Sequence, residues 1–224
     1  MSTEVKTKES LFSKKNQELL KDPFNDNNPI TVQVLGICSA LAITVKLEPA
    51  IVMSLSVMFV LSVGNVIISL IRNLIPNRIR IIVQLVVVAS LVILVDQFLK
   101  AFAYDVSKQL SVFVGLIITN CIIMGRFEAF ALGNGPWKAF LDGIGNSIGY
   151  GVILIAVAFV RELLGSGQLM GAQIIPLSWY IDMDNGTGFY ANNGFFLFPP
   201  MALIVVGMII WAQRAKNTKL IEEN

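Results

Sequence analysis

Long apolar stretches separated by short polar connections dominate this sequence. Six of them lie at about 29–45, 50–71, 79–102, 109–125, 146–164 and 196–213. At 1.5 Å per residue, the second, third, fifth and sixth are long enough for a helix to cross a hydrocarbon core of roughly 30 Å. The first and fourth are shorter, because charged residues follow after about 16 or 17 positions. The pattern predicts an all-α integral membrane protein with six transmembrane helices, the first segment of each half being short or broken.

The two halves of the chain share a short pattern. A short apolar segment carries a cysteine, Cys38 or Cys121, and a basic residue, one further residue and a glutamate follow it. These triplets are Lys46-Leu-Glu48 and Arg126-Phe-Glu128. Because three predicted spans separate the cysteines, the halves would cross the membrane in opposite directions, as two inverted three-helix repeats. In inverted repeats, interrupted segments at matching positions mark a site near the bilayer midplane, and here they contain the two cysteines.

We expect three parts along the chain. Residues 1–28 form a polar leader without the features of a secretory signal peptide, residues 29–213 form a single membrane domain with repeats at about 29–102 and 109–213, and residues 214–224 form a tail. The connection at 165–194 contains no Lys or Arg, whereas the alternate connections and the tail are basic. By the positive-inside rule, both termini are predicted to be cytoplasmic and this connection to face outward.

Composition removes several classes of function. Of the 224 residues, 55 % are hydrophobic and 14 % are charged, and the mean hydropathy is +0.71, which disfavours a water-soluble fold. Basic residues are not clustered with aromatic ones, so nucleic acid is not an expected partner. Histidine is absent, which excludes histidine metal sites, histidine haem ligands and histidine proton relays. Chemistry would have to use carboxylates, the backbone or the two cysteines.

Cys38 and Cys121 are the only cysteines, and three interpretations stay open for them. Free cysteine is often a small buried hydrophobic residue, and a disulfide is a second option. The third is metal ligation, because thiolates are the ligands of iron–sulfur clusters. Such clusters normally need four thiolates, so a second chain would have to supply another pair.

Ionisable residues near membrane depth are the next candidates. Asp96 and Asp142 have no basic residue within three positions, so we interpret them as unpaired acids on a possible cation path. Arg126 with Glu128, and Arg161 with Glu162, are interpreted instead as pairs at helix ends.

Several longer runs resemble one known family closely. They include Leu35-Gly-Ile-Cys-Ser-Ala-Leu-Ala, Leu70-Ile-Arg-Asn-Leu-Ile-Pro-Asn, Ile118-Thr-Asn-Cys-Ile-Ile-Met-Gly-Arg-Phe-Glu-Ala-Phe-Ala and Arg161-Glu-Leu-Leu-Gly-Ser-Gly. These runs resemble the D/E membrane-subunit family of the bacterial Na⁺-translocating NADH:quinone reductase (Nqr), its D subunits in particular, from residue 27 to residue 211. The Rnf ferredoxin:NAD⁺ complex has a related subunit. The run Lys46-Leu-Glu-Pro-Ala looks closer to the Nqr form.

The resemblance implies a partner, a cofactor and a location. A homologous E subunit would pair with this chain in a six-subunit complex of the bacterial inner membrane that pumps Na⁺. Between them the two proteins would hold a [2Fe–2S] or single-iron centre that relays electrons across the membrane, with Cys38 and Cys121 as this chain's ligands. Flavin, NADH and quinone chemistry would lie on other subunits. The alternatives are the Rnf homologue, a small-solute transporter built from an inverted repeat, and a structural scaffold.

Overall fold

A computed structural model describes residues 20, 23, 27–76, 78–102, 114–169, 172–173 and 194–216, and these residues are almost entirely helical. The polar leader and the connection at 165–194, which is predicted to face outward, therefore lie mostly outside the described residues. The elements are α2 (Ile37–Ile43), α3 (Leu47–Ile71), α4 (Arg80–Phe102), α6 (Val114–Ile118), α7 (Cys121–Arg126), the π-helical turn η1 (Phe127–Ala131), α8 (Pro136–Ser166), strands β1 (Gln168–Leu169) and β2 (Ala172–Gln173), the 3₁₀ turn η3 (Gly194–Leu197) and α9 (Pro199–Lys216).

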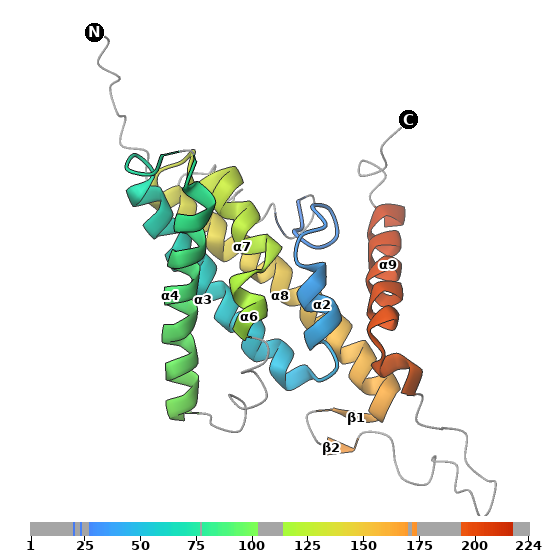
Figure 1. Ribbon diagram of the computed structural model, residues 1–224. Helices are drawn as coiled ribbons and strands as arrows, with labels where there is room; N and C mark the ends of the chain where they lie inside the picture. The colour runs from blue at the N-terminus through green and yellow to red at the C-terminus, as the bar shows by residue number, and fades with distance from the viewer. Residues whose placement is uncertain are drawn as a thin grey trace, which may run out of the picture.

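Helices α3 and α8 form the centre of the bundle (Figure 1). They approach each other closely at Gly143, where an added Cβ would lie 2.9 Å from the Ser62 Cα atom. Helix α4 flanks α3 on one side, α9 lies at the opposite side, and the short helices α2, α6 and α7 lie between them. The core is made of apolar side chains from α3 and α8 together with the short helices, including Met53, Val57, Leu61, Ile122, Ile123, Tyr150, Leu154 and Val157.

Three helices among the described residues are long and apolar enough to cross a membrane: α3, residues 80–101 of α4, and α8. The first predicted segment contains the short helix α2, with 7 residues, and the described part of the fourth, from residue 114, contains the short helices α6 and α7, with 5 and 6 residues. The predicted start of the fifth segment, at about 146, is wrong because α8 begins at Pro136, with proline in its first turn. The first turns of α8 carry Lys138, Asp142 and Asn146, so they do not form part of an apolar run.

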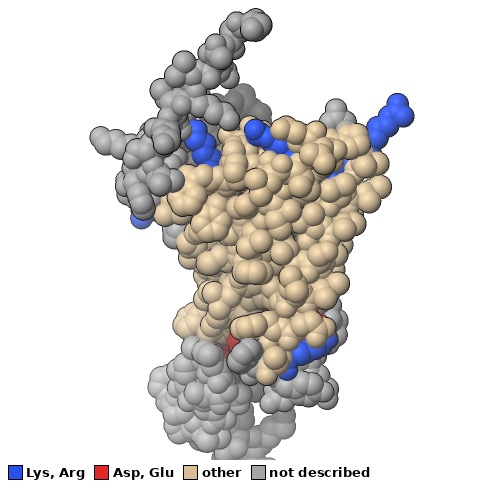
Figure 2. Space-filling model, turned by 90° about the vertical axis from the view of Figure 1, so that its left-hand side faces the viewer, with Lys and Arg blue, Asp and Glu red and all other residues tan. Residues whose placement is uncertain are grey.

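On the face that Figure 2 shows, charged side chains gather at the two ends of the bundle, with a belt of uncharged residues between them. The end of α3, the start of α4, the start of α8 and the end of α9 all lie at one end (Figure 1). That end carries the basic residues Arg72, Arg78, Arg80, Arg126, Lys138, Arg214 and Lys216. The basic connections that the sequence assigned to the inner side are therefore close together in space.

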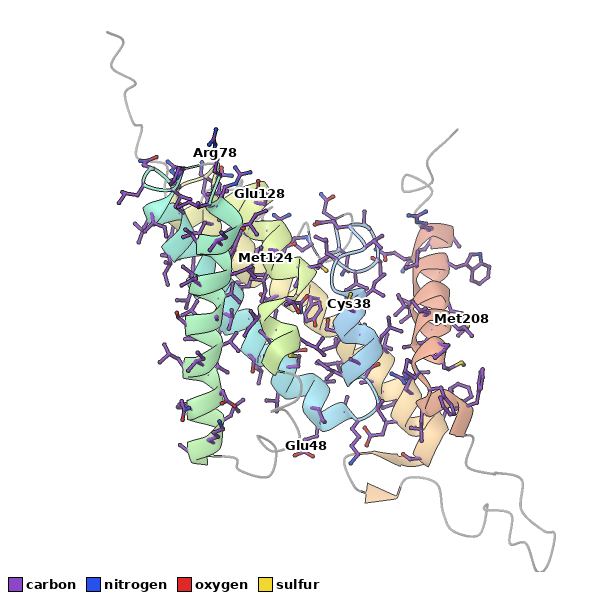
Figure 3. All side chains as sticks on the ribbon, in the orientation of Figure 1. Cys38, Glu48, Arg78, Met124, Glu128 and Met208 are labelled. Atoms are coloured by element: carbon purple, nitrogen blue, oxygen red, sulfur yellow. The ribbon has the colours of Figure 1, made fainter. Side chains whose placement is uncertain are left out.

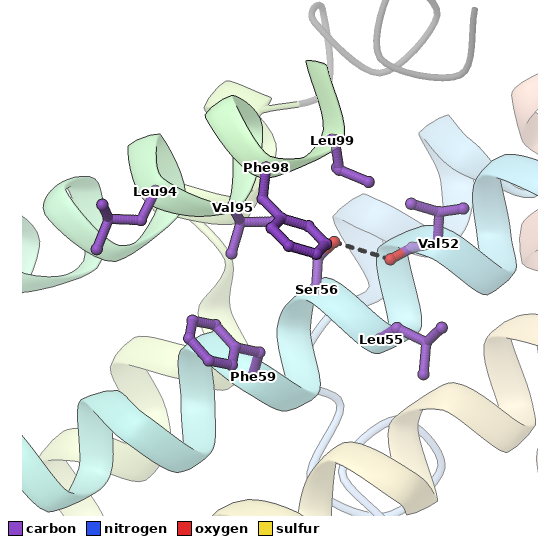
Figure 4. Close-up of a pocket in the computed structure, with 8 residues that line it drawn as sticks. All are labelled: Val52, Leu55, Ser56, Phe59, Leu94, Val95, Phe98 and Leu99. Carbon is purple, nitrogen blue, oxygen red and sulfur yellow. Dashed lines mark hydrogen bonds between the residues drawn. The ribbon is translucent and has the colours of Figure 1, made fainter. Parts of the chain in front are cut away.

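The belt exposes large apolar side chains on α4 and α9, among them Ile82, Val86, Phe98, Leu203 and Trp211. An apolar groove of about 580 Å³ runs between α3 and α4 (Figure 4). Its single polar side chain, Ser56, donates to the Val52 carbonyl at 2.8 Å within its own helix. The groove therefore offers no free polar group, as expected of a surface that contacts lipid tails or another apolar helix.

Candidate functional site

The first cysteine lies at the start of a helix that begins with a glycine. Gly36 precedes α2 with a φ of +85°, in the left-handed region that glycine tolerates, and no side chain caps the helix. Cys38 is the second residue of α2, at a height between the charged ends labelled by Arg78 and Glu48 in Figure 3. The preceding loop is fixed to α8, because the Asn28 side-chain amide donates to the Gly149 carbonyl at 3.2 Å.

The second cysteine lies at the start of a helix that begins with an asparagine. Thr119 and Asn120 interrupt the fourth apolar segment, and the Asn120 Oδ1 atom accepts from the Ile122 N–H at 3.3 Å. This side-chain cap satisfies one of the free amide groups of the new helix, whose first residue is Cys121. Helix α7 then continues into the π-helical turn η1.

The two cysteines, 83 positions apart in the sequence numbering, meet in space. The Cys121 thiol lies within interaction range of the Cys38 thiol and of the Gly36 backbone. Gly125 supports this approach, because an added Cβ there would lie 3.0 Å from Leu35 Cδ1, just before α2. Both cysteines are free and exposed at the surface of this chain. In this chain the pair is therefore neither joined as a disulfide nor buried.

The pair can supply part of a metal site and no more. Within the described residues, no group of three or more His, Cys, Asp and Glu side chains could hold a metal. Two adjacent soft thiols that open onto the protein surface fit one half of a four-thiolate iron site, provided that another chain supplies the rest. The donor set therefore fits an iron centre at an interface between subunits.

The interpretation of Asp96 and Asp142 as unpaired acids is wrong. Lys100, one helical turn after Asp96, donates to it at 2.6 Å. Arg126 Nε donates to Asp142 at 3.0 Å, and a second guanidinium nitrogen pairs with its other oxygen. Both partners lie beyond three positions in the sequence, because helical neighbours are four apart and Arg126 comes from another helix.

Asp142 is also the acid with the more elaborate surroundings. Its side chain is 2 % exposed, and the Asn146 amide donates to it at 3.0 Å. It lines a polar cavity of about 250 Å³ together with Pro23, Asn27, Gln33, Arg126, Phe130 and Asn146. Asp96, by contrast, takes part in a surface pair within one helix.

The two pairs expected at helix ends are also wrong. Glu128 pairs with Arg80 at the start of α4 and accepts from Gln84 at 3.3 Å. Glu162 accepts from the backbone N–H of Leu47 at 2.5 Å, where α3 begins. Each acid therefore bonds to a different helix rather than to the arginine beside it in the sequence.

Arg161 is fully buried inside the protein instead of extending outward from a helix end. It donates to Thr44 Oγ1 at 2.6 Å, at the end of α2, and to the backbone carbonyls of residues 196–198 at 2.9 to 3.2 Å. A guanidinium group can satisfy so many oxygens because it carries five N–H donors in a fixed plane. Arg161 thereby holds α2, α8 and η3 together.

Comparison with known proteins now adds to this geometry. Residues 16–210 match the family model described as "Rnf-Nqr subunit, membrane protein". The chain belongs to the Rnf-Nqr family. It is 58 % identical over 202 residues to the D subunit of the Na⁺-translocating NADH-quinone reductase of Photobacterium profundum, covering 90 % of this chain and 93 % of that protein. It is 56 % identical over 211 residues to the D subunit from Pasteurella multocida, covering 94 % and 99 %.

Two polar residues near the thiols of this Rnf-Nqr chain have no signal in the local sequence. Tyr150 is fully buried in α8, and its hydroxyl oxygen lies 2.6 Å from Ser39 Oγ, beside Cys38. The sequence analysis missed both, because a serine next to a cysteine and a tyrosine in an apolar helix are both common. A polar side chain within the predicted span at 146–164 is the one feature that could have drawn attention to Tyr150.

Proposed function

We propose that this chain is an electron-transferring membrane subunit of a Na⁺-translocating NADH:quinone reductase. The observation that carries the proposal is the pair of exposed thiols, Cys38 and Cys121, which two short helices from different halves of the chain bring together. Relatives named as the D subunit of that enzyme match over 90 to 94 % of the chain and support the same assignment.

In this proposal the two thiolates hold half of a [2Fe–2S] or single-iron centre, and a homologous E subunit supplies the other half. An iron centre accepts and passes on electrons one at a time, which an electron relay requires. Cys38 and Cys121 would bind the metal as thiolates, whose negative charge the metal offsets in an apolar interior. The surrounding apolar residues Ile37, Ile122 and Ile123 would limit access of water to the ligands. No flavin or NAD is assigned to this chain.

We further propose that the chain crosses the bacterial inner membrane six times as two inverted repeats, with both termini in the cytoplasm. The basic end of the bundle supports this orientation, because cytoplasmic connections carry an excess of Lys and Arg. The central position of Cys38 between the two charged ends supports a site near the midplane. The two short helices at matching places in the halves are typical of inverted-repeat membrane proteins.

The cation path is proposed to include Asp96 and Asp142. Asp142 is the stronger candidate because it lines a polar cavity near the basic end of the bundle. Since Lys100 and Arg126 pair with the two carboxylates, the acids would contribute to the electric field along the path, or contact Na⁺ after the ion pair opens.

Cysteine variants test the electron-relay proposal. Cys38→Ala and Cys121→Ala, each in the purified complex, should lose the iron of this site and NADH-driven quinone reduction, while flavin reduction by NADH on other subunits persists. Met124→Leu is the matched control. Met124 also carries a sulfur on α7, but a thioether cannot bind a metal as a thiolate, and leucine has a similar volume. This variant should keep both iron and activity.

Metal analysis and a visible spectrum of the complex give the result. A double alanine variant that retains both its iron content and its quinone reductase rate would refute the proposal. A complex that contains iron but shows ferredoxin:NAD⁺ activity in place of quinone reduction would favour the Rnf alternative. A complex that carries no iron would favour a small-solute transporter or a scaffold.

A further inference from the structure

One tyrosine contacts the surroundings of both cysteines from a third helix. Tyr150 lies near the middle of α8 and is fully buried. Its hydroxyl oxygen is 2.6 Å from Ser39 Oγ, and Ser39 follows Cys38. Asn120, the residue before Cys121, lies close to the same place, because a Cβ added to Gly36 would be 3.7 Å from its Oδ1 atom. Tyr150 thus contacts the start of α2 at the point where the residue before α7 is also close.

The direction of these contacts follows from counting protons. The Ser39 hydroxyl donates to the Gly36 carbonyl at 2.7 Å, and a serine hydroxyl has only one proton. At the contact between Ser39 and Tyr150, the tyrosine must therefore be the donor. The result is a polar chain that runs from Tyr150 on α8 through Ser39 to the Gly36 carbonyl at the first turn of α2.

The aromatic ring of Tyr150 adds a steric contact. A Cβ added to Gly36 would lie 2.8 Å from Tyr150 Cε2 and 3.7 Å from Asn120 Oδ1. The backbone at the start of α2 is therefore seated directly against the ring. Only glycine allows this approach together with the φ of +85° found at Gly36.

The two short helices need such an external support. With 7 and 6 residues, α2 and α7 have few internal hydrogen bonds, and helices of this length are not stable by themselves. A hydrogen bond in an apolar interior is stronger than one in water, so a single buried hydroxyl can have a large effect on their positions. Tyr150 is placed to act on α2 through Ser39 and Gly36, and thereby on the position of Cys38 relative to Cys121.

We propose that Tyr150 is a positioning residue that fixes the separation of the Cys38 and Cys121 thiols through its hydrogen bond to Ser39. The proposal rests on the electron-relay function for its purpose, since it assigns to Tyr150 the control of the ligand geometry of the iron centre. Tyr150 is not a ligand, and it acts only through the residues beside the cysteines. Loss of its hydroxyl should therefore change the spectrum and the midpoint potential of the metal site while the iron stays bound.

The first test measures the metal site in the purified complex. Tyr150→Phe, which keeps the ring, and Ser39→Ala should each retain iron but show a changed electron paramagnetic resonance line shape and a shifted midpoint potential. Because both remove the same hydrogen bond, the double variant should differ little from either single variant. Ser39→Thr, which keeps a hydroxyl, should restore the wild-type spectrum. Ser54→Ala is the control, since among the described residues its buried hydroxyl bonds only to the Ala50 carbonyl within α3, at 3.0 Å.

The second test measures the thiols without the metal. Dibromobimane becomes fluorescent when it bridges two nearby thiols, so its reaction with the full chain in membranes after iron removal reports their separation. Tyr150→Phe should reduce the yield of bridged product by about fivefold, the change expected for the loss of one buried hydrogen bond. Ser54→Ala should leave the yield unchanged.

The outcomes separate the two proposals. Wild-type spectra, potential and bridging in Tyr150→Phe would overturn the positioning role, while loss of iron in the cysteine variants would leave the electron relay standing. Conversely, iron that persists in the cysteine variants would overturn the electron relay. Reduced bridging in Tyr150→Phe would still support its control of the thiol separation.

Discussion

The two interruptions that carry the cysteines reach similar geometry by different chemistry. At the first, between the loop and α2, the helix begins with Gly36 in a left-handed conformation and has no side-chain cap. At the second, between α6 and α7, the Asn120 side chain caps the helix. A glycine supplies conformational freedom, whereas an asparagine supplies a hydrogen-bond acceptor.

The far ends of the two short helices differ in the same way. Helix α2 is followed by its C-cap residue Thr44, which accepts from the buried cation Arg161. Helix α7 ends with its own cation, Arg126, which pairs with the buried anion Asp142. Both partners belong to α8, so this helix holds the first short helix with a positive charge and the second with a negative one. Two short helices can therefore be held in similar places by residues that do not match.

The largest effect is expected at the first interruption, from loss of Arg161. Arg161→Leu would leave Thr44 and the carbonyls of residues 196–198 without their donor, at about 1–3 kcal/mol for each buried group left unsatisfied. The sum approaches the whole stability of a typical protein. We expect the chain to disappear from the purified complex, as measured by quantitative immunoblotting of membranes and of the complex.

Two further variants show whether the charge or the planar group of Arg161 matters. Arg161→Lys should be intermediate, because an ammonium group cannot reach all of these oxygens. Lys46→Ala is the control, since Lys46 is an exposed basic residue at the same interruption and its loss should have little effect. Normal amounts of the Arg161→Leu variant would mean that α2 is held by apolar packing alone.

A smaller effect is expected at the second interruption, from loss of Asp142. Asp142→Asn leaves the mostly buried Arg126 without its anion, which should cost at most roughly 3 kcal/mol. The Na⁺ concentration for half-maximal quinone reduction should rise as well. Asp96→Asn should raise it less, because that acid lies in an exposed pair within one helix.

Steady-state rates of the purified variants as a function of Na⁺ concentration test this prediction. A double variant, Arg126→Gln with Asp142→Asn, separates the role of the acid in stability from its role toward Na⁺. It no longer has an unpaired Arg126 charge, so stability should recover, but the Na⁺ requirement should stay raised. An unchanged Na⁺ dependence in both Asp142→Asn and Asp96→Asn would leave these acids with a structural role only.

The smallest losses of stability are expected from substitutions at the two helix starts, and they distinguish the role of Gly36 from that of Asn120. Asn120→Ala removes a cap and should cost about 1 kcal/mol, whereas Asn120→Asp should keep it. Gly36→Ala should cost more, because the methyl group meets the Tyr150 ring in a backbone conformation that alanine disfavours. Thermal inactivation of the purified complexes ranks the variants. Equal costs at both positions would contradict the distinction between a steric and a hydrogen-bonded start.

The sequence predicts where the apolar segments are interrupted, but not which contacts hold the short helices in place. Charged residues shortly after Cys38 and Cys121 limit the apolar segments to lengths below a full crossing, and this limit can be counted directly. The contact between Ser39 and Tyr150 spans 111 positions, and that between Arg161 and Thr44 spans 117. No local pattern encodes such pairs, because they depend on the angle at which α8 crosses the short helices. The ion pair of Arg126 and Asp142 was missed for the same reason.

The shortness of α2 and α7 has a consequence for how the protein enters the membrane. A segment inserts on its own as a helix when about 20 apolar residues let it satisfy its backbone inside lipid. Helices α3, α4 and α8 meet this requirement, whereas α2 and α7 have 7 and 6 residues. The long helices should therefore insert first, and the cysteine-bearing segments should fold against α8 afterwards. The two thiols would then meet only at the end of biogenesis, after the scaffold that brings them together is complete.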